Sequence, residues 1–540
     1  MYKLDFESNK QIYLILVLII VCSLSLKLYT IDFSVHEVQD TWLYALRGIA
    51  NSNGDFAESP IKPPGYPLFL SLFFNFLDSE NFIDYVNVGR ILAIITSSAI
   101  IFPIYFLGKH FFEKKFALLL PLFFAFQPQL NFNAGQALSE PYFLIVLITS
   151  LYFLFNTNSK YSTYVSFILL GLLFWIRFSG LLFVAPFIIS HFLIHRDLKK
   201  LVICCFLFLL IISPILVSRD EQYDNPLFFP ISVGDEKEFK SIPDRFDPNW
   251  FQTSFGNLFY ALGIMSVPFL IFLFPIGMLL SIKTSENKKN FLSIWILLIL
   301  TFIPMLIQYF IGTSARPLYH IYPFLMIFSI IPIVFFYKYK INFLNSAKKK
   351  KFLILLIIFL ILSSVLVTVG IDNLGYGKKD ILKIQEIHTY AKDILTLKGE
   401  LFWSKGESIS WVSLTMIEES DGNFKNYKIP KTLQRFHDGL EVYYPISLGE
   451  IYPNELNIHT KTNANTIDAF IANANDLNIK YLSVGPKNDV SFFDDVYANE
   501  QDYPYLKIIF DSKKSGFEKY EVKLFEINYD IFSKFINNSR

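Results

Sequence analysis

The sequence predicts a polytopic α-helical membrane protein of about eleven transmembrane helices followed by a soluble α/β domain. Of the 540 residues, 53% are hydrophobic and 59 are Phe, and the mean hydropathy of +0.40 exceeds that of an ordinary soluble domain. Apolar runs recur up to residue 369, whereas charged residues, Asn and Tyr dominate from residue 371 onward. These observations divide the chain into a membrane domain, residues 1–370, and a soluble domain, residues 371–540.

The membrane domain contains apolar runs that can cross a bilayer, which takes about 20 residues of helix. The runs are residues 11–28, 85–107, 116–126, 138–155, 161–176, 180–194, 201–217, 258–282, 291–311, 318–337 and 352–369. Because no small-residue cleavage site follows the first run, we interpret it as a retained anchor. All three cysteines lie inside these runs, which favours packing residues over a disulfide framework or a metal site.

Lysine and arginine predict the orientation of the spans, because short cytoplasmic loops carry an excess of both. Basic clusters occupy alternate loops, at residues 109–115, 195–200, 283–289 and 338–351. This alternation predicts a multi-pass cell-membrane protein with a cytoplasmic N-terminus. It places the loops of residues 32–84 and 218–256, and the soluble domain, outside the cytoplasm. The net charge of +1 gives no reason to expect nucleic acid as a partner.

Within the soluble domain, local patterns predict a small α/β fold. Residues 380–397 have helical spacing, and residues 467–475 read as a helix that leads into a strand at 479–484. Residues 506–510 and 520–527 alternate like the two strands of a hairpin.

The first outer loop places polar chemistry beside the membrane. Glu37 and Asp40 are three residues apart, so in a helix both carboxylates share one face. A carboxylate in a half-dry interface suits a general base, because partial burial raises its pKa; the alternative is a solvated loop charge. Lys62 precedes the rigid sequence Pro-Pro-Gly-Tyr-Pro and suits an anionic phosphate, or else snorkels beside the membrane.

Charged residues also interrupt the apolar runs. Glu140 stands at the start of one run, where the helix dipole favours an acidic side chain, so that capping the helix is its simplest role. Arg177 lies between two runs and needs a partner or an aqueous cavity, and Glu140 is a candidate partner. Arg316 offers a planar fork that matches phosphate oxygens. It stands near Tyr319 and His320, and a hydrogen-bonded interfacial histidine is the simpler interpretation of the latter.

Together these patterns resemble the glycosyltransferase C superfamily over residues 11–370. Within it, the dolichyl-phosphate-mannose-protein mannosyltransferase-like enzymes (glycosyltransferase family 39) and the lipid A aminoarabinose transferases are the nearest likeness. The resemblance rests on an acid–Tyr–Gly–Pro-Pro loop, a Ser-Glu-Pro motif, an arginine before Ser-Gly-Leu, and a late Arg-Tyr element. In this chain they are Asp40, Tyr44, Gly54 and Lys62-Pro63-Pro64-Gly65-Tyr66-Pro67; Ser139-Glu140-Pro141; Arg177 with Ser179-Gly180-Leu181; and Arg316 with Tyr319.

The resemblance implies a membrane glycosyltransferase that moves a monosaccharide from a polyprenyl (dolichyl) phosphate to a protein or lipid acceptor outside the cytoplasm. It implies Asp40 as the catalytic base and Lys62, Arg177 and Arg316 as ligands of the lipid phosphate. Tyr44, Glu140, Tyr319 and His320 complete the expected substrate site. Because cations can stabilise a monophosphate leaving group, the chemistry does not require a cofactor. A divalent metal is compatible with it but not indicated, because the acidic residues of the acidic loop, Asp220 to Asp247, have a spacing that matches no defined metal site and is simpler to read as a solvated loop.

The chain departs from the family in two places. Thr41 follows Asp40 where the family often has a second acid, which leaves Glu37 for that role, and Pro317-Leu318 interrupts the Arg-Tyr pair. The Trp-Trp-Asp-Tyr-Gly signature of oligosaccharyltransferases is absent, which argues against transfer of a whole oligosaccharide. The alternatives are a polytopic transporter or lipid flippase, which usually shows repeated halves, a membrane-anchored scaffold, and an O-antigen polymerase or ligase.

Overall fold

The computed structural model describes residues 9–34, 40–56, 63–223, 249–266, 270–283, 288–309, 316–338, 346–373, 381–404, 414–429, 441–442, 456–486 and 490–539. The chain forms two compact units. The helical unit comprises Met1–Asp32, Glu58–Tyr66 and Asn87–Gly377, and the tail unit comprises Phe33–Ala57, Pro67–Val86 and Lys378–Arg540. The first outer loop therefore contributes to both units, and two helices, α3 (Gly65–Phe74) and α4 (Phe82–Ala99), each begin in one unit and end in the other.

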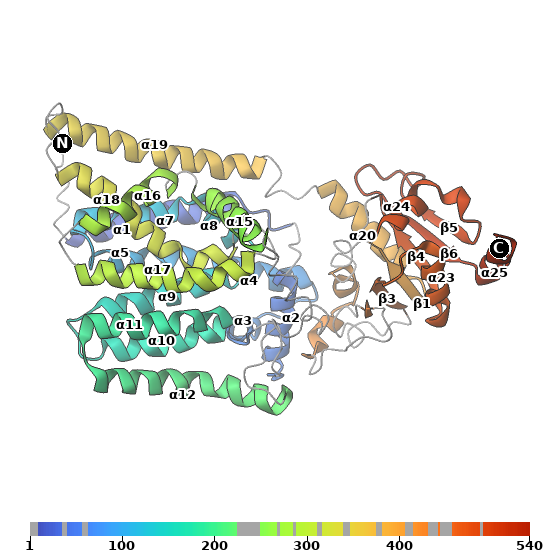
Figure 1. The fold of residues 1–540 in the computed structure, drawn as a ribbon, viewed down its shortest axis with the longest axis horizontal. Helices are drawn as coiled ribbons and strands as arrows, with labels where there is room; N and C mark the ends of the chain where they lie inside the picture. The colour runs from blue at the N-terminus through green and yellow to red at the C-terminus, as the bar shows by residue number, and fades with distance from the viewer. Residues whose placement is uncertain are drawn as a thin grey trace. The chain divides into compact units, whose positions relative to one another are not determined.

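The helical unit is a bundle of apolar helices (Figure 1). Its elements are α1 (Asn9–Tyr29), α4 (Phe82–Ala99), α5 (Ile101–Gly108), α6 (Lys114–Ala117), α7 (Leu119–Ala125), α8 (Pro128–Ala134), α9 (Glu140–Phe155), α10 (Ser162–Ile176), the 3-10 helix η1 (Phe178–Phe183), α11 (Val184–His195), α12 (Leu198–Tyr223), α15 (Asn249–Ser266), α16 (Leu270–Lys283), α17 (Lys288–Tyr309), the 3-10 helix η3 (Arg316–His320), α18 (Tyr322–Lys338) and α19 (Ser346–Asn373). One continuous core of buried Phe, Leu and Ile runs through most of the bundle, from α5 to α19. Large apolar side chains are also exposed on the outer helices, as expected where a bundle faces lipid.

Five helices of the described residues are long and apolar enough to cross a membrane: Asn9–Tyr29, Phe82–Gly108, Phe178–His195, Leu198–Glu221 and Lys350–Gly370. Shorter apolar helices accompany them. The multi-pass membrane class is thereby supported, whereas the count of eleven spans is not confirmed. The sequence predicts one span over residues 258–282; the described part of this range belongs to two helices, α15 and α16, and residues 267–269 lie outside the described residues.

Prolines inside the helices leave backbone carbonyls without their helical donors. Pro214 in α12 leaves the carbonyl of Leu210 without its helical donor, and the hydroxyl of Ser213 donates to that carbonyl at 2.9 Å. Pro332 in α18 frees the carbonyl of Phe328 in the same way. Gly277 of α16 packs directly against that carbonyl, where an added Cβ would overlap the oxygen. The two helices therefore approach closely because residue 277 has no side chain.

The tail unit contains a six-stranded sheet in the order β2-β3-β1-β4-β6-β5. Strands β3, β1 and β4 are parallel, and β2, β5 and β6 pair antiparallel to their neighbours. Its elements are α2 (Asp40–Ser52), α3 (Gly65–Phe74), α20 (Ile381–Leu395), β1 (Gly399–Trp403), η4 (Asn423–Asn426), β2 (Glu441–Val442), β3 (Leu456–Lys461), α23 (Ile467–Asp476), β4 (Ile479–Val484), α24 (Ser491–Ala498), η5 (Glu500–Asp502), β5 (Leu506–Asp511), β6 (Lys523–Ile527) and α25 (Tyr529–Ser539).

Adjacent residues of β1 show how helices cover both faces of this sheet. Phe402 packs against Phe470 of α23 and Phe493 of α24, whereas Trp403 packs against Tyr390 of α20. Because successive strand residues point to opposite faces, α20 lies on one face and α23 and α24 on the other. The predicted helix-then-strand unit is present as α23 and β4, and the predicted hairpin is the antiparallel pair β5 and β6.

Candidate functional site

A buried carboxylate held by two arginines is the strongest polar cluster of the helical unit. Oε1 of Glu140 lies 2.9 Å from Nη1 of Arg177 and 2.7 Å from Nε of Arg316. The Glu140 side chain is 2% exposed, whereas those of Arg177 and Arg316 are 23% and 27% exposed. The carboxylate is thus sealed while both guanidiniums reach the surface, and the three side chains together carry a formal charge of +1.

The local sequence explains why Glu140 stands at this point. Helix α9 begins at Glu140 with Pro141 next, and proline is favoured in a first helical turn because its missing N–H has no partner there anyway. The carboxylate therefore sits at the positive end of the helix dipole. The hydroxyl of Ser139 does not cap the helix but accepts a hydrogen bond from Arg177 at 3.2 Å. One arginine nitrogen thus contacts two consecutive residues of the motif.

A sharp break in the backbone presents Arg177. Helix α10 ends at Ile176, and Arg177 is extended, with φ −150° and ψ 133°, before η1 begins. Gly180 folds back onto the end of α10, where an added Cβ would come 2.7 Å from the backbone of Leu173 and Phe174. The break therefore requires glycine at residue 180.

The short helix η3 brings Arg316 to the same place. His320 is the last residue of η3. Its Nε2 lies 2.9 Å from the hydroxyl of Ser179 in η1, and its ring packs edge to face against the ring of Phe143 in α9. Tyr319, 1% exposed, donates its hydroxyl to the carbonyl of Gln129 at 2.9 Å. Three segments that are distant in sequence, around residues 140, 178 and 318, are thereby tied together.

The Pro-Pro-Gly-Tyr turn of the first outer loop supports this cluster. Gly65 packs against the backbone of Trp175, two residues before Arg177. The hydroxyl of Tyr66 donates to the carbonyl of Ala137 at 2.8 Å, and its ring lies 4.7 Å from that of Tyr142. Ala137 has a positive φ of 50°, so this hydrogen bond holds a strained backbone just before Glu140.

The predicted base is described in the tail unit. Asp40 is the first residue of α2, where a carboxylate is favoured by the helix dipole, and it is half-buried. Tyr44, one turn further, is 3% exposed and belongs to the buried face of α2. The predicted partner acid Glu37, the predicted phosphate ligand Lys62 and most of the acidic loop, residues 224–247, lie outside the described residues.

Sequence reasoning missed several buried cations of the helical unit, among them Arg219 and Lys27. Arg219, fully buried near the end of α12, stacks its guanidinium 4.6 Å from the ring centroid of Phe178, next to Arg177 in sequence. Lys27, 2% exposed in α1, donates to the hydroxyls of Ser23 and Ser98. Both residues stand at the end of an apolar run, where a cation is common in membrane proteins. Only their burial, which the sequence does not show, distinguishes them from ordinary cations at a membrane edge.

The cluster is suited to an anion that carries more than one oxygen. A buried carboxylate fixes both guanidiniums, and the arginine fork matches phosphate oxygens through paired hydrogen bonds. In the described part of the chain no group of three or more His, Cys, Asp or Glu side chains could hold a metal ion.

Comparison with known proteins points to one fold. Residues 61–217, which include Gly65, Glu140 and Arg177, match the family model described as dolichyl-phosphate-mannose-protein mannosyltransferase. The oligosaccharyltransferase of Archaeoglobus fulgidus in its apo form is similar with a TM-score of 0.57 and 13% identity, covering 88% of this chain and 70% of that chain. No curated protein matches in sequence.

Two further structures extend the likeness. The same archaeal oligosaccharyltransferase, AglB, in complex with an inhibitory peptide and a dolichol-phosphate, matches with a TM-score of 0.54 and 12% identity over 88% of this chain and 69% of that one. ArnT from Cupriavidus metallidurans in the apo state matches with a TM-score of 0.52 and 12% identity over 94% of this chain and 97% of that one. At such identities the likeness establishes the fold.

Proposed function

We propose, from the premise that this chain is a membrane glycosyltransferase of the glycosyltransferase C type, that it transfers one monosaccharide from a polyprenyl phosphate to a protein or lipid acceptor. The observation that carries this proposal is Glu140 buried between Arg177 and Arg316. Two of these residues lie within the segment that matches the mannosyltransferase family model. The reaction takes place on the extracytoplasmic face, where the positive-inside alternation puts the first outer loop.

In this proposal the two arginines bind the phosphate that leaves the sugar. When the bond between the anomeric carbon and the phosphate oxygen breaks, negative charge develops on that oxygen, and fixed cations stabilise it without reorganising. Glu140 orients both arginines and leaves them a net positive charge. Lys62, on the adjoining loop, is a third proposed ligand of the same phosphate. Tyr319 and His320 fix η3 and thereby Arg316.

Asp40 is the proposed general base. Its carboxylate takes the proton of the acceptor hydroxyl while the acceptor oxygen forms the new bond at the anomeric carbon, so that the configuration inverts. Glu37 is the proposed second acid of this loop, and Tyr44 the proposed support of the α2 face on which Asp40 stands. A monosaccharide is favoured over an oligosaccharide because the chain lacks a Trp-Trp-Asp-Tyr-Gly sequence.

The first test is donor cleavage by the purified protein. It is incubated in nanodiscs with a panel of polyprenyl-phosphate sugars and an acceptor lysate, and free polyprenyl phosphate is measured. Release with at least one donor is expected. If no donor is cleaved, the transferase proposal fails and a transporter or scaffold becomes the better interpretation.

Variants then separate the proposed roles. Asp40→Asn should lower kcat on the order of 10² to 10⁴-fold, the usual contribution of a general base, while donor binding persists. Arg177→Lys should raise the KM for the donor, because lysine replaces the fork with a single point charge. Arg196→Lys, at the exposed end of α11, is the matched control and should match the wild type. Full activity of Asp40→Asn would remove Asp40 from the mechanism.

A further inference from the structure

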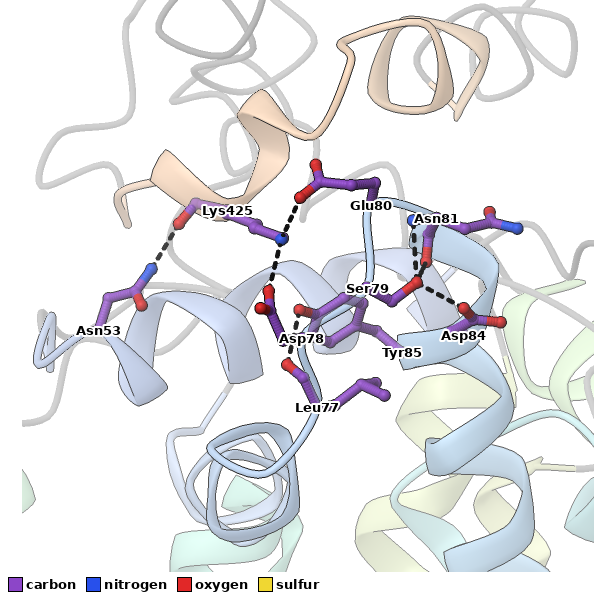
Figure 2. A network of polar contacts seen from close by, with 9 residues as sticks. All are labelled: Asn53, Leu77, Asp78, Ser79, Glu80, Asn81, Asp84, Tyr85 and Lys425. Carbon is purple, nitrogen blue, oxygen red and sulfur yellow. Dashed lines mark hydrogen bonds and ion pairs between the residues drawn. The ribbon is translucent and has the colours of Figure 1, made fainter.

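Within the tail unit, one segment of the soluble domain is docked on the first outer loop. The docking segment, residues 420–429, contains η4, which lies beside α2. The segment contacts residues 53–55, directly after α2, and residues 78–85 (Figure 2). The two partners are more than 340 residues apart in sequence. Helix α2 begins at Asp40, the proposed base, so the segment contacts the element that carries it.

Aromatic packing forms the apolar half of this contact. Phe424 is fully buried, with its ring 5.4 Å from Phe82 and 5.6 Å from Tyr85, both edge to face. Tyr85 in turn meets Phe74 of α3 at 5.2 Å. The ring of Phe74 packs against Gly48 of α2, where an added Cβ would come 2.6 Å from that ring. A continuous series of packed rings therefore leads from the docking segment to the middle of α2.

Polar contacts fix the position of the docking segment on the loop. The ammonium of Lys425 donates to Asp78 at 2.9 Å and to Glu80 at 2.7 Å, as Figure 2 shows. At the end of α2, the side-chain amide of Asn53 donates to the carbonyl of Lys425. The carboxylate of Asp55 accepts a hydrogen bond from the backbone N–H of Ile429 at 2.7 Å. Because exposed ion pairs contribute little affinity, the buried ring supplies the stability and these contacts supply the alignment.

Gly422 adds a backbone constraint to the docking segment. Its φ of +79° lies in the left-handed region, where a side chain is disfavoured. An added Cβ would also collide with the carboxylate of Glu80, which is 76% exposed and can turn aside at the cost of its exposed ion pair with Lys425. The backbone conformation is therefore the main obstacle to a side chain at residue 422.

We propose that the docking segment is a positioning element for Asp40, so that the soluble domain holds α2, through Phe424 and Lys425, in the geometry that transfer requires. This inference rests on the proposed function, because it assigns Asp40 a catalytic role. Phe424 and Lys425 do not touch the substrate in this scheme. They act through α2, and a displacement of about 1 Å in a reacting group can cost on the order of 10²-fold in rate.

The test measures turnover and backbone protection on the same full-length variants. Phe424→Ala and Gly422→Ala should raise amide hydrogen exchange in residues 40–52 and lower kcat roughly tenfold to a hundredfold, with the KM for the donor nearly unchanged. Lys425→Ala removes only exposed ion pairs, so its changes should have the same direction and be smaller. Lys425→Arg keeps a cation between the two carboxylates and should restore both readouts. A general loss of stability would not be rescued in this way.

Matched controls lie elsewhere in the soluble domain. Lys507 also forms an exposed ion pair, with Glu526, and Gly516 also has a positive φ, of +82°, but has nothing within 4 Å of an added Cβ. Lys507→Ala and Gly516→Ala should leave exchange in α2 and kcat at wild-type values. If they lower kcat as much as the docking variants, or if the docking variants leave both readouts unchanged, the inference is overturned.

Hydrogen exchange also separates this inference from the proposed function. If the wild type cleaves no donor, the transferase proposal and the catalytic role of α2 both fall. Increased exchange of α2 in Lys425→Ala would then still establish that the segment holds the loop.

Discussion

Gly65 lies so close to Trp175 that a Cβ on residue 65 would come 2.6 Å from the Trp175 carbonyl oxygen. The first outer loop and the end of α10 are therefore in direct backbone contact two residues before Arg177. The side chain of Trp175 is itself anchored, since its indole N–H donates to the carbonyl of Ile211 at 2.8 Å.

Gly65→Ala should therefore displace the backbone that presents Arg177. We expect a loss of about 1–3 kcal/mol in stability, the usual cost of inserting an atom into a packed site, together with a higher KM for the lipid donor. Gly256→Ala, in α15 with nothing within 4 Å of the new Cβ, is the control and should be neutral. Thermal unfolding in detergent and donor titration measure the two effects. Wild-type behaviour of Gly65→Ala would show that the close contact is not required.

Glu140→Gln tests the buried carboxylate. Removing its charge leaves two guanidiniums beside a neutral amide, and breaking a buried ion pair from one side costs about 3–5 kcal/mol. We expect a lower unfolding temperature and a loss of donor cleavage. Glu113 provides a matched control, because it also lies between two cations, Lys115 at 3.1 Å and Lys338 at 3.2 Å, but its side chain is 51% exposed.

For Glu113→Gln the expected loss is below about 1 kcal/mol, because exposed pairs are screened by solvent. Unfolding temperatures of both variants, measured in the same detergent, decide the comparison. Equal losses would mean that burial of Glu140 does not make its ion pairs more important than those on the surface.

The sequence anticipated the parts of the site that follow from local chemistry. An arginine between apolar runs needs a partner or an aqueous cavity, so Glu140 could be named as a candidate partner of Arg177, and the structure pairs the two. The helix and strand at 467–484 followed from periodicity. The count of spans was not confirmed, because helices of 14 to 18 residues separated by a few residues, such as α15 and α16, read as one apolar run.

Long-range contacts could not be read from local patterns. Lys425 and Glu80 are 345 residues apart, and each occurs in an ordinary polar stretch. The docking segment has no periodicity that singles out Phe424 as buried. The same holds for His320, whose hydrogen bond to Ser179 joins two short 3-10 helices, η3 and η1, that are far apart in sequence. Only the folded chain shows these partners.

The ion pairs of Lys425 should make docking insensitive to pH near neutrality. Hydrogen bonding and charge attraction from Lys425 lower the pKa of the Asp78 carboxyl, and Glu80 and Asp78 raise the pKa of Lys425 above its usual range. Because the pKa of the carboxyl is lower in the folded state, its ion pair stabilises the contact at any pH above the unfolded pKa, and this stabilisation is lost as the pH falls through the folded pKa. Because the pKa of the ammonium is higher in the folded state, its ion pairs stabilise the contact at any pH below the unfolded pKa, and this stabilisation is lost as the pH rises through the folded pKa.

Both effects are therefore fully present between about pH 5 and pH 9. We expect amide exchange in residues 420–429, corrected for the intrinsic pH dependence, to be constant over this interval and to rise only in stronger acid or alkali. Since both carboxylates are exposed, the rise should be small. A clear change in protection between pH 6 and pH 8, on the order of tenfold, would contradict the assignment of these ion pairs. It also follows that a shifted pH–rate profile in a docking variant cannot arise from Lys425 or Asp78 themselves.

The contact between α16 and α18 should be equally intolerant of a side chain. Gly277→Ala places a methyl group on the carbonyl oxygen of Phe328, and this oxygen is backbone that cannot turn away as a flexible side chain could. We expect a loss of about 1–3 kcal/mol, measured as a lower unfolding temperature. Gly263→Ala in α15 is the matched control, because an added Cβ there meets nothing within 4 Å. Alanine has the higher helix propensity by about 0.5–1 kcal/mol, so the control should be neutral or slightly stabilising. If both variants unfold at the same temperature, helix propensity outweighs the steric contact and the close approach of α16 to α18 is not maintained in the membrane.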